Sequence, residues 1–100
     1  MSIFDFFKRK REQVPVTVSG GDGATSQTAV VVTAPNSRMG IRAEHQYLTE
    51  TLGEPSVDWT FNSQALIEIG GRRYDVFKVT LKSGEERSIY FDIEGFFGKF

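Results

Sequence analysis

The stretch from residue 65 to residue 93 most constrains what this chain can fold into, because it predicts a three-stranded antiparallel meander. Runs rich in β-branched and aromatic residues cover residues 65–69, 74–81 and 87–93, and glycines stand in both breaks between them. This combination is typical of strands that are joined by hairpin turns. Apolar residues recur at alternate positions, so one face of the predicted sheet lies on a core and the other is largely exposed to water.

The odd-numbered positions of the meander form the predicted core face. We expect the following residues to be buried together: Phe77, Val79, Ile89, Phe91, and from earlier in the chain Leu48 and Trp59. The second face is mainly polar, but four residues make part of it apolar: Leu66, Tyr74, Val76 and Tyr90. Such a face predicts a protein interface, the floor of a ligand site, or a surface that another part of the chain covers.

The two hairpins of the meander differ in how well the sequence defines them. At the second, a three-residue loop at residues 82–84 pairs Phe77 with Ile89. At the first, a two-residue turn at residues 70–71 pairs Ile67 with Tyr74 and moves Ile67 away from the core face. A longer loop, or a bulge near residue 72, keeps Ile67 in the core, and we favour this irregular loop.

A helix is predicted from residue 37 to about residue 52, with a start nearer Arg42 as the alternative, because Gly40 weakens the first turn. Asn36 or Ser37 can cap its start, and Gly53 followed by Pro55 is a strong stop signal. The predicted buried stripe consists of residues at helical spacing: Ile41, His45, Leu48 and Leu52. Residues 28–34 and 57–62 read as further strands, and the second of these either continues into the meander or turns at residues 63–64.

The order of these elements predicts an α+β fold. In it, one helix packs on a four- to five-stranded, mostly antiparallel sheet in β-α-β-β-β order, with a short C-terminal turn or helix at residues 94–100. We expect one domain over residues 28–100, preceded over residues 1–27 by a flexible N-terminal arm and a glycine-rich linker. Residues 14–18 form either a weak edge strand or extended linker, because Pro15 cannot donate a ladder hydrogen bond.

Composition excludes several classes of function. The absence of cysteine excludes disulfides, thiolate nucleophiles and cysteine–metal sites, and a net charge of −1 argues against nucleic acid as a partner. His45 is the only histidine, and no second histidine is present to share a metal ion. We therefore expect no metal, no cofactor and no catalytic residues. No apolar run approaches the roughly 20 residues that a membrane-crossing helix needs, so we expect a cytoplasmic protein.

The first dozen residues form a separate signal, in which apolar and aromatic residues precede a basic run. The residues that we consider for membrane contact are Ile3, Phe4, Phe7, Lys8, Arg9, Lys10 and Arg11. The start MSIFDFFKRKR resembles the membrane-targeting start of the bacterial division-site factor MinE, over about an eighth of the chain, and it implies a bacterial source. A short helix of this kind favours anionic lipid weakly. The alternative is a disordered, solubilising start.

Together these observations predict a non-catalytic protein-interaction module. We expect its partner to be another protein, including a second copy of the chain that docks through the second sheet face or an edge strand. The alternative is a peripheral membrane adaptor that is tethered by its N-terminal phenylalanines and basic residues.

Overall fold

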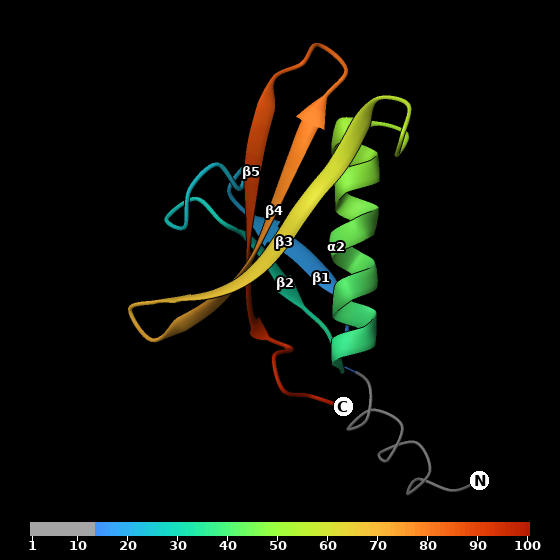
Figure 1. The fold of residues 1–100 in the computed structure, drawn as a ribbon. Coiled ribbons are helices and arrows are strands. Elements are labelled where there is room, and N and C mark those ends of the chain that lie inside the picture. The colour runs from blue at the N-terminus through green and yellow to red at the C-terminus, as the bar shows by residue number, and fades with distance from the viewer. Residues whose placement is uncertain (1–13) are drawn as a thin grey trace, which may run out of the picture.

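The computed structural model describes residues 14–100, which form one five-stranded sheet with one helix across one of its faces (Figure 1). The elements are β1 (Thr17–Gly20), β2 (Val30–Thr33), α2 (Ser37–Leu52), β3 (Trp59–Ile69), β4 (Arg72–Leu81) and β5 (Glu86–Gly95). The strands lie in the order β1-β2-β5-β4-β3, with β2 and β5 parallel and the other neighbours antiparallel. The α+β class is confirmed, and the sheet is mixed.

Strand β1 and the loop after it belong to the sheet. β1 pairs with β2 from Thr17 opposite Thr33 to Gly20 opposite Val30. In the following loop, the Tyr90 N–H of β5 donates to the Gly23 carbonyl at 2.7 Å. The structured part therefore begins before residue 28, where the sequence suggested a boundary, because the glycine-rich backbone finds partners in the sheet. The predicted N-terminal arm at residues 1–13 lies outside the described residues.

Strand β3 and the turn after it correct the predicted register. β3 joins the two predicted runs into one strand of 11 residues, with a bulge between Phe61 and Ser63. Gly70 and Gly71 have φ angles of 58° and 81°, as a two-residue type I′ turn requires. Our preference for an irregular loop is wrong, and Ile67 lies opposite Tyr74 on the face away from the helix. The second hairpin has the predicted register.

The helix ends as predicted, and it begins at Ser37 rather than nearer Arg42, because both of its ends are chemically well defined. At the start, the Asn36 Oδ1 accepts a hydrogen bond from the Met39 N–H at 2.9 Å. At the end, Gly53 has a φ of 107° and its N–H donates to the Thr49 carbonyl at 3.0 Å. Both contacts satisfy backbone groups that the ends of a helix leave unpaired.

The face of α2 that meets the sheet differs from the predicted one. The buried residues are Gly40, Ala43, Glu44 and Leu48. Ile41 and His45 are exposed at the margin of this face, so the predicted stripe is wrong for both. The reason is close packing at Gly40, where an added Cβ would lie 2.4 Å from the ring of Phe96. The helix and the C-terminal segment can approach this closely only at Gly40, where the helix has no side chain.

The main core lies between α2 and the sheet. It contains all six residues that we expected there: Phe77, Val79, Ile89, Phe91, Leu48 and Trp59. Phe77 and Phe91 are fully buried and pack edge to face, with ring centroids 5.4 Å apart. The core prediction is confirmed because alternation along the strands depends only on local geometry.

The contact at Gly40 gives the first prediction. Helix propensity alone predicts that Gly40→Ala stabilises the protein by about 1 kcal/mol. We expect the opposite, a lower free energy of unfolding in urea, because the new methyl group meets the buried Phe96 ring. Thr49→Ala, on the exposed face of the same helix, serves as the control and should not destabilise. A Gly40→Ala variant as stable as that control would contradict the packing described.

Candidate functional site

A groove between α2 and the edge strand β3 is the most distinctive surface of the described residues. It has a volume of about 320 Å³ and lies on the helix side of the sheet. Its lining residues come from α2, β3, β4, β5 and the C-terminal segment: Ser37, Ile41, Gln64, Leu66, Asp75, Ile93, Phe96, Phe97, Gly98 and Phe100. We call it the α2–β3 groove.

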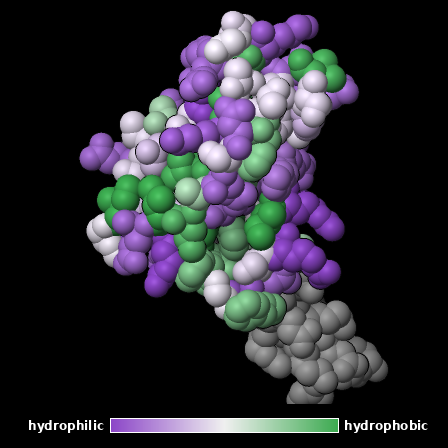
Figure 2. Space-filling model, in the orientation of Figure 1, coloured by the Kyte–Doolittle hydropathy of each residue, from purple (hydrophilic) through white to green (hydrophobic). Residues whose placement is uncertain are grey.

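Large apolar side chains remain exposed along this groove. Ile41 is 42% exposed, Leu66 55% and Phe97 41%. Figure 2 shows apolar side chains gathered over the β3–β4 hairpin and continuing towards the lower end of the molecule. They are exposed because α2 packs over the inner strands and β3 lies at the sheet edge (Figure 1). A contiguous apolar surface of this kind is typical of an interaction site.

The C-terminal segment closes one end of the groove. The Lys99 carbonyl accepts hydrogen bonds from the Ser37 N–H at 2.8 Å and from the Ser37 hydroxyl at 2.7 Å. The Arg73 guanidinium lies over the Phe97 ring, 4.6 Å from its centroid, and pairs with Glu94 at 3.5 Å. These contacts attach the segment to the start of α2 and to β4, so the groove has a fixed wall.

Two carboxyl groups lie beneath the groove. Glu44, on the buried stripe of α2, is 0% exposed, and Asp75, on the helix face of β4, is 7% exposed. Neither oxygen of Glu44 has a hydrogen-bond partner among the described residues. Burial, and to a lesser degree the neighbouring Asp75, raises the pKa of Glu44 to about 10. Glu44 therefore carries its proton at neutral pH and is uncharged.

Glu44 holds a proton beside Asp75, but the buried position of the two groups restricts proton transfer to a substrate. A general acid has to reach the substrate atom that it protonates, within hydrogen-bonding distance or through one water. Glu44 is completely enclosed, and Asp75 reaches the surface only at the floor of an apolar groove. The arrangement is thus better suited to binding than to proton transfer.

The outer edge of β3 is the second part of the site. In a two-residue hairpin the residues flanking the turn exchange hydrogen bonds, and bonded pairs then alternate along the ladder. Ile69 and Arg72 flank the turn, so Ile69 and Ile67 point their backbone groups towards β4. The N–H and C=O groups of Gln64, Leu66 and Glu68 point outwards. Within residues 14–100, no strand pairs with this edge.

The four residues of the predicted apolar face lie on two different faces of the sheet. Tyr74 and Val76 are buried at 7% and 6% exposure, and they pack in a second cluster with Ala29, Ile67 and Tyr90. Leu66 lies on the opposite face, beside Asp75, so our placement of Leu66 with the tyrosines is wrong. The two-residue turn is the cause, because relative to the favoured longer loop it moves the even-numbered residues of β3 to the helix face and the odd-numbered ones to the other face.

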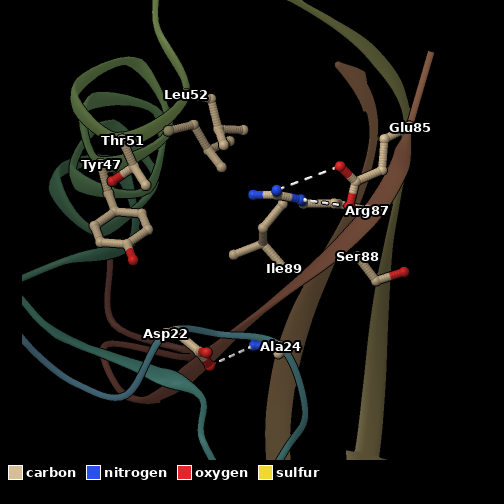
Figure 3. Close-up of a pocket in the computed structure, with 10 residues that line it drawn as sticks. Asp22, Ala24, Tyr47, Thr51, Leu52, Glu85, Arg87, Ser88 and Ile89 are labelled. Carbon is tan, nitrogen blue, oxygen red and sulfur yellow. Dashed lines mark hydrogen bonds and ion pairs between the residues drawn. The ribbon is translucent and has the colours of Figure 1, made fainter. Parts of the chain in front are cut away.

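A separate hollow of about 470 Å³ lies between the C-terminal half of α2, β5 and the loop of residues 22–24 (Figure 3). Its charged side chains Arg87 and Asp22 already have partners. The Arg87 Nε lies 3.1 Å from the Glu85 carboxylate, and the Asp22 carboxylate accepts a hydrogen bond from the Ala24 N–H at 3.0 Å, which lowers the pKa of Asp22. We assign no chemistry to this hollow.

The described residues contain no group of three or more His, Cys, Asp or Glu side chains that could hold a metal ion. His45 is an exposed side chain at the margin of the packed face of α2, and its ring and that of Phe77 pack edge to face with centroids 5.5 Å apart. In the same part of the chain, no helix is long and apolar enough to cross a membrane. The residues considered for membrane contact precede residue 14 and lie outside the description.

Sequence reasoning missed both Glu44 and Asp75, although signals for both were present. Asp75 has the same parity as Phe77 and Val79, which places it on the core face. Glu44 stands four residues from Gly40 and four from Leu48, so the three share one helix stripe. Because that stripe begins with a glycine and contains a charge, it does not resemble a core face.

Comparisons of this chain with protein-family models, with curated proteins and with solved structures found no match.

The proton held by Glu44 predicts how stability depends on pH. In the unfolded chain Glu44 ionises near its ordinary value of 4.5, whereas in the folded protein it keeps its proton up to about pH 10. Unfolding therefore releases a proton within this range, and the free energy of unfolding should fall as pH rises, by about 1.4 kcal/mol per pH unit for this group.

Glu44→Gln should remove this part of the slope and should raise stability at pH 8, since an amide carries no charge to bury. Chemical denaturation at pH 5.5 and at pH 8 measures both effects. Glu50→Gln, at an exposed position on the same helix, is the control and should keep the slope of the wild type. If Glu44→Gln keeps that slope as well, the buried proton is excluded.

Proposed function

We propose that this chain is a non-catalytic protein-interaction module that acts in the cytoplasm. The observation that supports this proposal best is the open edge of β3, whose outward backbone groups have no partner strand within residues 14–100. Soluble proteins normally protect such an edge with charged side chains, proline, β-bulges or short strand length. β3 has 11 residues and no lysine, arginine or proline, and its bulge between Phe61 and Ser63 leaves the stretch from Ser63 to Ile69 regular, with Glu68 as the one charge. A regular open edge beside an apolar groove favours a protein ligand that adds a strand.

The arrangement of charge supports binding over catalysis. Glu44 has the most strongly shifted pKa beneath the groove, and it is sealed from any substrate. The only histidine packs against Phe77 and lies outside the groove lining. An enzyme would need a nucleophile or a general base that the groove can present to a substrate. The peripheral membrane adaptor remains our alternative, and it depends wholly on residues 1–13.

Site-specific photo-crosslinking tests this function. A benzophenone amino acid in place of Leu66 should give a crosslinked species of higher mass in the cells that produce the protein, because β3 is expected to contact its partner there. The same probe in place of Val57 is the control, since Val57 and Leu66 are both 55% exposed and Val57 precedes the strand. Crosslinking at residue 66 no greater than at residue 57 would contradict the proposal.

A further inference from the structure

The free edge of β3 has a pattern that complements itself. Within this strand Glu68 is the only charged residue, and the outward-facing backbone groups belong to Gln64, Leu66 and Glu68. Two antiparallel strands can form a ladder only when outward-facing residues of one oppose outward-facing residues of the other. For two identical strands, a two-fold axis at Leu66 meets this condition.

We propose that a second copy of this chain occupies the edge, with the two β3 strands paired antiparallel about a two-fold axis at Leu66. This inference rests on the proposed function and names its partner. In this register Leu66 lies beside Leu66 of the second copy. Gln64 lies opposite Glu68 of the second copy, so an amide N–H can donate to a carboxylate on each side of the axis. The interface is isologous, as in most homodimers.

Other axes centred on an outward-facing residue of β3 fit the strand less well. An axis at Glu68 places two carboxylates directly opposite each other, which is unfavourable in a sheet. An axis at Gln64 brings the bulge between Phe61 and Ser63 into the new ladder and interrupts it. The axis at Leu66 avoids both, because it uses the regular part of the strand from Ser63 to Ile69.

The pairing also accounts for the exposed apolar side chains. Directly opposite residues of an antiparallel pair point to the same face, so both α2 helices lie on one side of the joined sheet. The two α2–β3 grooves then meet along the paired strands. Leu66, which is 55% exposed, packs against its own counterpart, and the five-stranded sheet becomes continuous across the axis.

Engineered disulfides test this register, since the chain has no cysteine of its own. Residues that exchange hydrogen bonds across an antiparallel pair have Cα atoms about 5.5 Å apart, which suits a disulfide. Full-length protein carrying Leu66→Cys, incubated with oxidised glutathione, should form a covalent dimer at least ten times faster than Val57→Cys, the equally exposed control. Equal rates would indicate random collision and would overturn the proposal.

Sedimentation equilibrium of the full-length, cysteine-free protein provides the second measurement. The wild type and Val57→Lys should both dimerise, whereas Leu66→Lys should remain monomeric, since it places two cations together at the axis. Circular dichroism should show that all three are folded. A monomeric wild type overturns the proposal. If such a monomer still crosslinks to another protein at residue 66, the interaction function stands and only the identity of the partner is wrong.

Discussion

The register of the β3–β4 hairpin is set by two glycines, and the contact surface depends on that register. Gly70 and Gly71 both have positive φ angles, which other residues adopt only with strain, and they place Ile69 opposite Arg72. Leu66 consequently lies beside Asp75, on the helix side of the sheet. A slip of one residue would exchange the faces of β3 and would place Ile67 in the groove. The turn thus decides which side chains the edge of the sheet offers to a partner.

The buried acid pair and the open groove are two results of the same packing. α2 lies close to the C-terminal segment because Gly40 leaves room for the ring of Phe96. This orientation places Glu44 on the face of α2 that meets the sheet. Burying an ionised carboxylate costs stability, so the pKa of Glu44 rises and the group stays protonated. The same orientation leaves Ile41 exposed and β3 uncovered.

Local patterns predicted the parts of the fold that local physics determines. Strand alternation identified the buried phenylalanines at positions 77 and 91, and the cap at Asn36 and the stop at Gly53 fixed the bounds of the helix. The orientation of the helix could not be predicted in this way. It depends on Phe96, far along the chain, meeting a glycine that periodicity counts as neutral. The hairpin register was predicted wrongly, because an isoleucine in the core and a two-residue glycine turn favour different registers and the turn determines the outcome. The groove depends on the orientation of the helix and on the register of the hairpin, so the sequence did not predict it.

Amide hydrogen exchange along β3 tests the central claim most directly, namely that the outer edge of this strand is a contact surface that a second copy occupies. The N–H of Ile67 points towards β4 and should exchange slowly at every protein concentration, whereas the N–H of Leu66 points outwards. The account predicts that exchange at Leu66 is fast in dilute solution and slows markedly as the concentration rises from micromolar to millimolar. A rate at Leu66 that does not change over this range would contradict it.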